Sequence, residues 1–312
     1  HPGKGLGIAI NDYDRDNWPD ILIANDGVAQ QLFHNLRNGK FDEVALPLGV
    51  AYDEDGKVFA GMGADFADYD NDGWPDIFIN ALANQRYALF RNTFQSNGSF
   101  EYASEASGLG SATRKHSGWG AKFIDYDNDG WKDLFVGQGH VMDNIQLTQP
   151  DLHYLESPLL LRNVSRNDGG KFVSTRPFDQ PRAARGVAFG DIDNDGSIDL
   201  VMNCNGGPAV VLRNQMSGNH WLMVNTIGTR GNRDGIGARI HLVTAGGADR
   251  YGVVSTASSY LSASDKRVYF GLGADRSAKS LEITWPSGTV QRIGNVRAGQ
   301  ILTVREPAED RR

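Results

Sequence analysis

The sequence predicts an all-β protein in which β-propeller blades of four antiparallel strands precede a small C-terminal β-sandwich-like domain. Two observations carry this prediction. A nine-residue aspartate pattern occurs four times, and short apolar runs bounded by Gly, Asn and Asp flank each copy at the same offsets. No helical period persists across any repeat. Serial units of four short strands are typical of propeller blades, which bury their faces only by stacking on neighbouring blades.

The four copies begin at positions 12, 68, 125 and 191, which gives periods of 56, 57 and 66 residues. Each carries Asp at positions 1, 3, 5 and 9 of the pattern, and a Gly lies five residues before each first Asp. The copies read Asp-Tyr-Asp-Arg-Asp-Asn-Trp-Pro-Asp at 12–20, Asp-Tyr-Asp-Asn-Asp-Gly-Trp-Pro-Asp at 68–76, Asp-Tyr-Asp-Asn-Asp-Gly-Trp-Lys-Asp at 125–133 and Asp-Ile-Asp-Asn-Asp-Gly-Ser-Ile-Asp at 191–199.

Each repeat predicts one strand before the aspartate loop and three after it. The first of the three is an apolar run, the second ends in a basic residue and Asn, and the third is led by Phe41, Phe100 or Phe172. The fourth repeat has no Phe-led strand and continues into a strand-like run at 219–224. That run either completes the fourth blade or opens the next domain.

The last third of the chain contains alternating strand-like runs separated by Gly, Asp and Ser, which predict a small β-sandwich. We therefore expect propeller repeats over 1–217, a second β-domain over 218–306 and a disordered polar tail over 307–312. The runs lie at 239–243, 250–254, 267–271, 281–285 and 301–304.

The spacing within the aspartate loop predicts a calcium site in each repeat, four in all. Carboxylates at positions 1, 3, 5 and 9, with the backbone carbonyl of position 7, offer the hard oxygen ligands that Ca²⁺ prefers, and Gly at position 6 allows the positive φ of a tight bend. The predicted ligands are Asp12, Asp14, Asp16, Trp18 and Asp20; Asp68, Asp70, Asp72, Trp74 and Asp76; Asp125, Asp127, Asp129, Trp131 and Asp133; and Asp191, Asp193, Asp195, Ser197 and Asp199.

Alternatives to calcium are weaker. An EF-hand needs Glu at position 12 and flanking helices, whereas the predicted strands place apolar residues there. Mg²⁺ requires stricter octahedral geometry. Four solvated acidic turns are the remaining alternative, and four copies in register favour the metal site over it. The Trp residues at position 7 could stack on sugars, but packing between blades is the favoured role.

Composition excludes several classes of function. The chain has 31 Lys and Arg against 38 Asp and Glu, a net charge of -7, and scattered basic residues, so we expect no nucleic-acid partner. No apolar run reaches the ~20 residues of a membrane span. No catalytic motif is evident.

The long connection at 138–158, with His140, Asp143, His153 and Glu156, is either a second ligand site or an ordinary packed loop.

The aspartate repeats resemble the FG-GAP/VCBS repeats of integrin-type propellers. Four motifs of the last third resemble the ASPIC/UnbV domain, and the whole arrangement is similar to the cartilage acidic protein family. These motifs are Asn-Arg-Asp-Gly-Ile-Gly-Ala-Arg at 232–239, Ser-Tyr-Leu-Ser at 259–262, Phe-Gly-Leu-Gly at 270–273 and Trp-Pro-Ser-Gly at 285–288. The resemblance implies calcium at the repeat aspartates, an extracellular location and no established reaction. It also implies about seven blades, which favours part of a longer propeller over a closed ring of four.

We therefore expect a secreted, calcium-binding structural or adhesion protein that is not an enzyme and engages a protein or glycan partner. Two alternatives stay open. One is an accessory or catalytic component acting on a glycan or secondary metabolite, and the other is a subunit that self-assembles into an extracellular fibre or surface layer through open blade edges.

Overall fold

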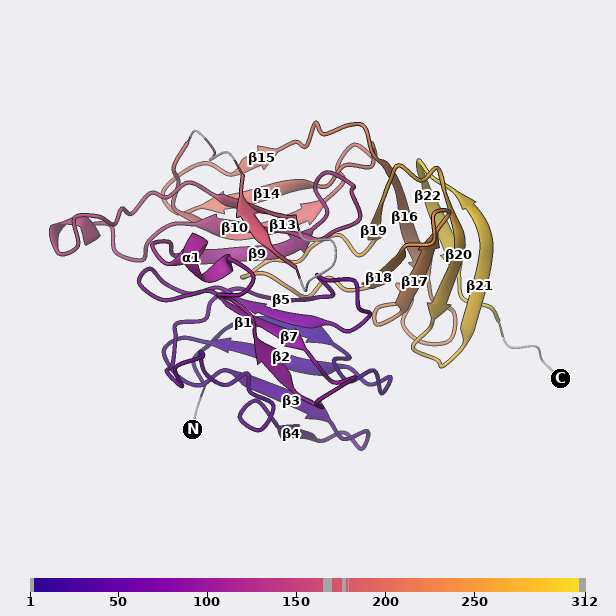
Figure 1. The fold of residues 1–312 in the computed structure, drawn as a ribbon, viewed down its shortest axis with the longest axis horizontal. Helices are drawn as coiled ribbons and strands as arrows, with labels where there is room; N and C mark the ends of the chain where they lie inside the picture. The colour runs from indigo at the N-terminus through magenta and orange to yellow at the C-terminus, as the bar shows by residue number, and fades with distance from the viewer. Residues whose placement is uncertain (1–2, 165–169, 176–177, 179, 309–312) are drawn as a thin grey trace.

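A computed structural model describes residues 3–164, 170–175, 178 and 180–308. Four propeller blades follow one another along the chain, and a two-sheet domain packs beside them (Figure 1). This arrangement confirms the predicted all-β fold. None of the described helices is long and apolar enough to cross a membrane. Residues 309–312 of the predicted tail lie outside the described residues.

The first three blades have four antiparallel strands each, with one strand before the aspartate loop and three after it, as predicted. Blade 1 contains β1 (Gly5–Asn11), β2 (Asp20–Asn25), β3 (Gln31–Asn35) and β4 (Phe41–Glu43). Blade 2 contains β5 (Ala64–Ala67), β6 (Asp76–Ile79), β7 (Ala88–Asn92) and β8 (Phe100–Tyr102). Blade 3 contains β9 (Gly118–Ile124), β10 (Asp133–Gln138), β11 (Leu159–Asn163) and β12 (Phe172–Ser174).

Blade 4 has three described strands, β13 (Ala184–Gly190), β14 (Asp199–Cys204) and β15 (Val210–Leu212). Two short helical segments, α1 (Leu109–Thr113) and the 3₁₀ turn η1 (Ile145–Leu147), lie in connections.

The glycines that precede the first three aspartate loops lie where neighbouring blades approach closely. A Cβ on Gly63 would lie 1.9 Å from the carbonyl oxygen of Trp119 in blade 3, and a Cβ on Gly7 would lie 2.2 Å from that of Met62 in blade 2. Any side chain there would collide with the next backbone, so the repeated glycine is a packing requirement of the innermost strands.

The C-terminal domain is a sandwich of two sheets, and the run at 219–224 opens it instead of completing blade 4. β16 (His220–Ile227) lies between β19 (Val268–Gly273) and a parallel β22 (Gln300–Arg305). The second sheet has the order β18 (Asp249–Val253), β17 (Arg239–Thr244), β20 (Ser277–Thr284) and β21 (Val290–Arg297). Sequence analysis missed β21, because this edge strand is mostly exposed and carries little apolar alternation.

A segment of the sandwich, residues 254–267 between β18 and β19, ties three blades together. Figure 1 shows it as an orange connection that runs between β5 and β9. Ser259 pairs with Ala64 of blade 2, and its hydroxyl accepts the Ala121 N–H of blade 3 and donates to the Val187 carbonyl of blade 4 at 2.9 Å. The two domains are therefore joined through the propeller axis and not only at their surfaces.

Blades 1 and 4 lie at opposite ends of the row of four blades (Figure 1), and in the described part of the chain each exposes apolar side chains on its outer face. Ile8 and Ile10 on β1 are 53% and 38% exposed, whereas Ala64 and Phe66 at the same offsets in blade 2 are buried. We call the face of blade 1 that carries Ile8 and Ile10 the leading face. The trailing face of blade 4 exposes Val201 and Val211 together with Ile192.

Candidate metal centres

Backbone amides hold each aspartate loop in shape. The carboxylate at position 1 accepts N–H groups from later in the loop, as at Asp191, which receives those of Asp195 at 3.1 Å and Gly196 at 2.8 Å. The carboxylate at position 9 accepts the N–H of position 2. It also accepts the N–H of the Asn that ends the second strand after the loop. Position 6 has positive φ in all four loops, which confirms that prediction. Position 4 also has positive φ, which sequence analysis missed.

Three of the loops bring the carboxylates of positions 1, 3 and 9 together, with one oxygen of each within 4.8 Å of the others. In the first loop the groups are different: positions 1, 3 and 5 form one, and positions 3 and 9 form another with His34. The groups of the second, third and fourth loops are Asp68, Asp70 and Asp76; Asp125, Asp127 and Asp133; and Asp191, Asp193 and Asp199.

The third loop is the most deeply buried. Burial, with a smaller contribution from the Asp129 charge, raises the pKa of Asp125 to about 7. Burial also raises the pKa of Asp133 to about 9, although the Asn163 N–H opposes the shift. Oδ1 of Asp125 is buried and has no hydrogen-bond partner in the described part of the chain. This site therefore contains one buried carboxylate oxygen that no described protein group satisfies.

Arginine at the end of the second strand after each loop neutralises positions 3 and 5 in blades 2 to 4. Arg91 lies 2.8 Å from Asp70, and Arg162 lies 2.8 Å from Asp127 and 3.2 Å from Asp129. Arg213 pairs with Asp193 and Asp195 in the same way. Within the described residues no ion pair reaches the deeper carboxylates of positions 1 and 9 in these three loops.

The Asn that follows this basic residue latches consecutive blades. Nδ2 of Asn163 in blade 3 donates to the Tyr69 carbonyl in the loop of blade 2 at 2.9 Å. Asn92 and Asn214 make the corresponding bonds to the Tyr13 and Tyr126 carbonyls. The repeated Asn was visible in the sequence, but only the structure shows that it joins one loop to the next.

The position-7 residues differ in environment. Their N–H groups donate to the position-5 carboxylate in every loop, at 2.8–2.9 Å. Trp74 packs between blades as expected, since the Arg15 guanidinium of blade 1 lies 5.2 Å from its ring. Trp18 is 43% exposed, which corrects the packing expectation for this residue.

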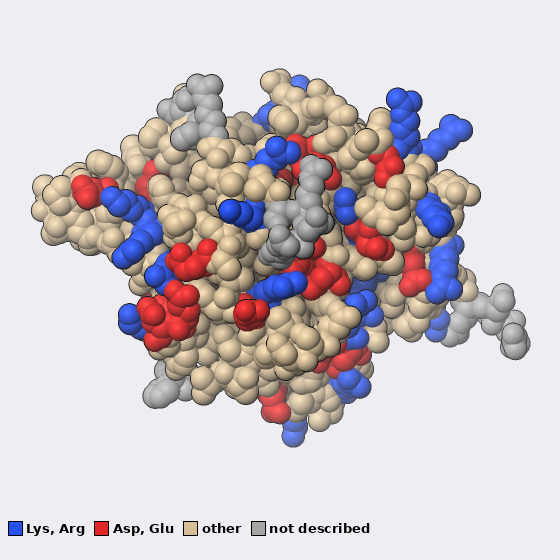
Figure 2. Space-filling view, viewed as in Figure 1, with Lys and Arg blue, Asp and Glu red and all other residues tan. Residues whose placement is uncertain are grey.

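The sandwich covers the aspartate loops of the propeller. Lys132 Nζ donates to the Tyr251 carbonyl at 3.0 Å, and a Cβ on Gly271 would lie 2.0 Å from Oδ2 of Asp125. A cavity of about 430 Å³ remains between the two domains, and it is lined by charges of both signs, among them Asp68, Lys122 and Arg250. Figure 2 likewise shows acidic and basic side chains interspersed over the face in view.

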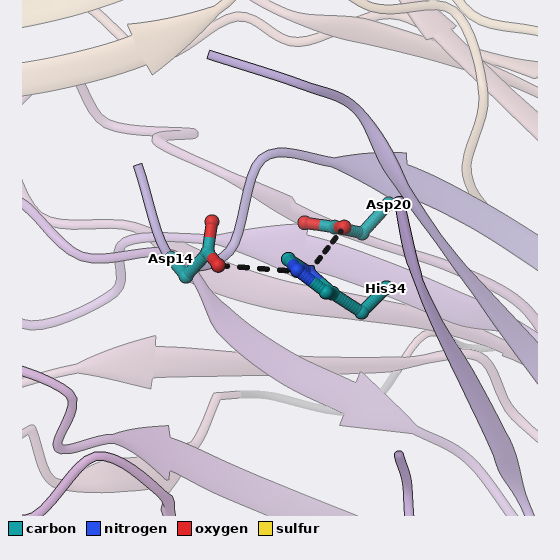
Figure 3. A group of neighbouring side chains, drawn as sticks. All are labelled: Asp14, Asp20 and His34. Carbon is teal, nitrogen blue, oxygen red and sulfur yellow. Dashed lines mark ion pairs between the residues drawn. The ribbon is translucent and has the colours of Figure 1, made fainter. Parts of the chain in front are cut away.

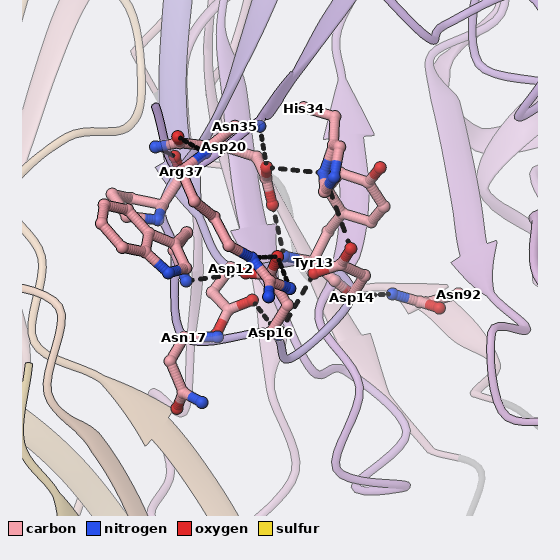
Figure 4. A network of polar contacts seen from close by, with 12 residues as sticks. Asp12, Tyr13, Asp14, Asp16, Asn17, Asp20, His34, Asn35, Arg37 and Asn92 are labelled. Atoms are coloured by element: carbon pink, nitrogen blue, oxygen red, sulfur yellow. Dashed lines mark hydrogen bonds and ion pairs between the residues drawn. The ribbon is translucent and has the colours of Figure 1, made fainter. Parts of the chain in front are cut away.

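The first loop has a different set of cations. Arg37 lies 2.6 Å from Asp16 (Figure 4), and Arg239 of the sandwich lies 2.5 Å from Asp12. Burial raises the pKa of Asp12 to about 6, and Arg239 limits that shift. His34 stands where the other blades carry Arg, and it faces both Asp14 and Asp20 (Figure 3).

The polar groups of the long connection at 138–158 do not assemble into one site. Glu156 accepts the Ser117 N–H and lies 3.1 Å from His116, while Nδ1 of His140 accepts the Met142 N–H. Asp143 and His153 are exposed. No group of metal-ligating side chains is found there among the described residues.

Comparison with known proteins gives two family matches. The family described as "FG-GAP-like repeat" matches residues 12–79 and 68–136, and the family described as "ASPIC and UnbV" matches residues 228–311.

Cartilage acidic protein 1 of Homo sapiens is 29% identical over 312 residues, which cover 97% of this chain and 44% of the human protein. The Mus musculus protein is 27% identical over 317 residues, covering 98% of this chain and 46% of the mouse protein. The chain thus spans less than half the length of these relatives.

Two solved structures are similar at low scores. One is an Agrocybe aegerita lectin that recognises non-reducing terminal N-acetylglucosamine, with a TM-score of 0.39, 14% identity, and coverage of 94% of this chain and 81% of the lectin. The other is a Bombyx mori GH32 β-fructofuranosidase, with a TM-score of 0.41, 10% identity, and coverage of 96% and 77%. At these scores the likeness carries no argument about function.

Proposed function

We propose that this chain, which carries FG-GAP-like repeats followed by an ASPIC and UnbV domain, is a non-enzymatic calcium-binding interaction protein whose four aspartate loops each hold one Ca²⁺. The observation that carries the proposal is the third loop. Its three clustered carboxylates include a buried oxygen of Asp125 without a hydrogen-bond partner among the described residues. Buried carboxylates of this kind are ordinarily paired or bound to a metal.

Electrostatics favour a divalent cation at the deep end of each loop. Two carboxylates ~4 Å apart repel by roughly 4 kcal/mol at an effective dielectric near 20. In blades 2 to 4 the arginines offset positions 3 and 5, and no ion pair among the described residues reaches positions 1 and 9. The nearby Lys132 charge opposes the rise in the pKa of Asp68 and Asp125 but does not cancel it. Carboxylates at positions 1, 3, 5 and 9, with the carbonyl at position 7, would supply the oxygen-only set that Ca²⁺ prefers over Mg²⁺.

The bound ion would stiffen the loops and not perform chemistry. Each loop connects the innermost strand of its blade to the next strand, and its neighbours are the adjacent blade and the sandwich. Calcium would therefore lock blade to blade and propeller to sandwich, leaving a rigid surface for a protein or glycan partner. Sites of moderate affinity fill in the millimolar calcium outside cells, so we place this protein there.

Calcium counting tests the proposal. The chelator-stripped chain, titrated by calorimetry and by equilibrium dialysis, should bind four Ca²⁺, and the Asp125→Asn variant should bind one fewer. Asp53→Asn is the matched control, because Asp53 also caps an acidic turn, accepting the N–H groups of Asp55 and Lys57, but lies outside the repeat pattern. Equal calcium content in all three proteins would contradict the assignment.

A second candidate function is self-assembly, and the two end faces favour it. Within the chain the trailing face of one blade packs on the leading face of the next, so the exposed ends are the two halves of an interface that the protein already makes. Val211 is 61% exposed, whereas Leu89 at the same offset is buried. We propose that a second copy of this chain docks its trailing face on the leading face.

Light scattering across a concentration series tests this assembly. We expect mass to rise with concentration, and Ile8→Asp or Val211→Asp to return the chain to monomer, since each places a charge in the contact. Exposed Leu147, which lies in the 3₁₀ turn away from both faces, supplies the control Leu147→Asp. A wild-type chain that stays monomeric at high concentration would exclude this function.

A further inference from the structure

We propose that the first aspartate loop is a mixed nitrogen and oxygen site that takes Zn²⁺ in preference to Ca²⁺, with Asp14, Asp20 and His34 as its protein ligands. This inference deepens the proposed function, which gives the loop its role as a metal site, and changes the metal at one of the four positions. The difference arises from one residue type and from the cations that surround the loop.

The sequence register isolates the residue. The position before the latching Asn holds Arg91, Arg162 and Arg213 in blades 2 to 4, and His34 in blade 1. A guanidinium has no lone pair for a metal, whereas a neutral imidazole is a strong ligand for borderline divalent ions. The first blade is therefore the one repeat in which this position can coordinate.

The geometry brings the ring nitrogen to two carboxylates from different ends of the loop. Nδ1 of His34 lies 3.2 Å from Oδ1 of Asp20 and 3.5 Å from Oδ2 of Asp14, and Figure 3 shows both carboxylates directed toward it. One atom of each residue lies within 4.8 Å of the others. Nδ1 itself is buried and makes no hydrogen bond with any described residue.

The other two carboxylates of this loop are paired with arginines. Arg37 donates to Asp16 through Nε at 3.0 Å and through Nη2 (Figure 4). Arg239 pairs with Asp12. The described carboxylates of this loop form two groups: positions 1, 3 and 5, of which positions 1 and 5 are the arginine-paired ones, and positions 3 and 9 with the imidazole. In the other three loops, positions 1, 3 and 9 stay together.

This donor set suits Zn²⁺. Zinc binds His nitrogen and Asp oxygen and accepts three protein ligands with water in the fourth place, whereas calcium takes six to eight oxygen ligands. Asp20 is fully buried and its two oxygens are oriented by the N–H groups of Tyr13 and Asn35. His34 is 25% exposed at its side chain, which leaves a path for the ion.

The test is metal content under competition. The stripped chain is dialysed against millimolar Ca²⁺ with micromolar Zn²⁺, and both metals are counted. We expect one Zn²⁺ in the wild type and none in His34→Arg, with zinc affinity about 100-fold lower in the variant or lower still. Arginine is native at the equivalent position of three blades, so the variant should fold. His34→Gln serves as a second variant.

The control is His241→Gln, because His241 also contacts a carboxylate, Asp249 at 2.6 Å, but pairs with no second one among the described residues. Its zinc count should equal that of the wild type. Cobalt as a probe should give a visible absorption band that His34→Arg lacks. Equal zinc in the wild type and His34→Arg, or no zinc in either, would overturn the inference. Calcium counted in the same samples reports separately on the other loops.

Discussion

The first and third aspartate loops share their nine-residue pattern and differ in nearly everything around it. The third loop lies between two blades and beneath the sandwich, its deep carboxylates are buried, and one oxygen lacks a partner among the described residues. The first loop lies on the leading blade and has arginines on positions 1 and 5, whereas Arg162 of the third loop pairs with positions 3 and 5. The first loop also has a histidine that faces positions 3 and 9. A ligand pattern therefore sets which groups can bind, while the segments that pack around each loop set the burial and the charge of those groups.

Removal of metal should lower stability more than any other change, and its effect should differ between the two loops. One ion at ~1,000 times its dissociation constant stabilises the fold by about 4 kcal/mol. Chelation should therefore lower Tm steeply, and hydrogen exchange should rise more at 125–133 than at 12–20. Calorimetry and exchange measured by mass spectrometry check this. Readdition of Mg²⁺ is the control and should restore little; an unchanged Tm on chelation would refute the comparison.

Asp125→Asn should destabilise the calcium-bound protein and stabilise the calcium-free protein. With calcium bound, the loss of one ligand should remove most of the ion's contribution of about 4 kcal/mol. Without calcium, the neutral amide should stabilise the fold, because it removes the free-energy cost of an ionised carboxylate in a buried position. Asp14→Asn in the half-exposed first loop should show the smaller change in both conditions. Urea unfolding with and without chelator measures this, and loss of stability by Asp125→Asn in both would contradict it.

The latch between blades gives a smaller contrast. Asn163→Ala leaves the Tyr69 carbonyl of the neighbouring blade without its side-chain donor and should cost about 2 kcal/mol. Asn35→Ala removes the bond to the Pro19 carbonyl and the one from the Arg37 N–H, both within the same blade, and should cost less. Urea unfolding of the two variants compares them directly. Equal losses would mean that the bond across the blades adds nothing.

The smallest effect concerns Glu306, whose surroundings lower the pKa of its carboxyl, whereas those of the third loop raise the pKa of Asp125. Burial opposes its ionised form, but the Ser287 hydroxyl and the N–H groups of Thr229 and Arg230 outweigh burial and lower the pKa of Glu306 below its ordinary 4.5. Because its folded pKa is lowered, its stabilisation is present above that ordinary value and is lost as pH falls through the folded value. Glu306→Gln should cost about 1 kcal/mol near neutral pH.

Thermal melts from pH 7 down to pH 3 check the Glu306 prediction. The gap in Tm between wild type and Glu306→Gln should close as the pH falls. Ser280→Ala, a substitution elsewhere in the same domain, should keep a constant offset from the wild type across this range. A gap that stays the same at every pH would show that the charge of Glu306 does not contribute.

Much of the fold was readable from local pattern. The Phe-led outer strands at Phe41, Phe100 and Phe172 and the strands on either side of each aspartate loop all formed where predicted. The candidate ligands were equally visible, because their spacing is local. The edge strand β21 and the positive φ at position 4 were not, since exposed strands and Asn turns leave weak signals.

The sequence by itself determined the repeat, the loop and the oxygen ligands that each loop offers, because short-range spacing and turn chemistry specify them. Tertiary structure alone decided that Ser259 ties three blades to the sandwich, that Arg239 reaches Asp12 across more than two hundred residues, and that His34 meets Asp14 and Asp20. The physical reason is that charge and burial depend on which distant segments pack together, and no local pattern records those contacts.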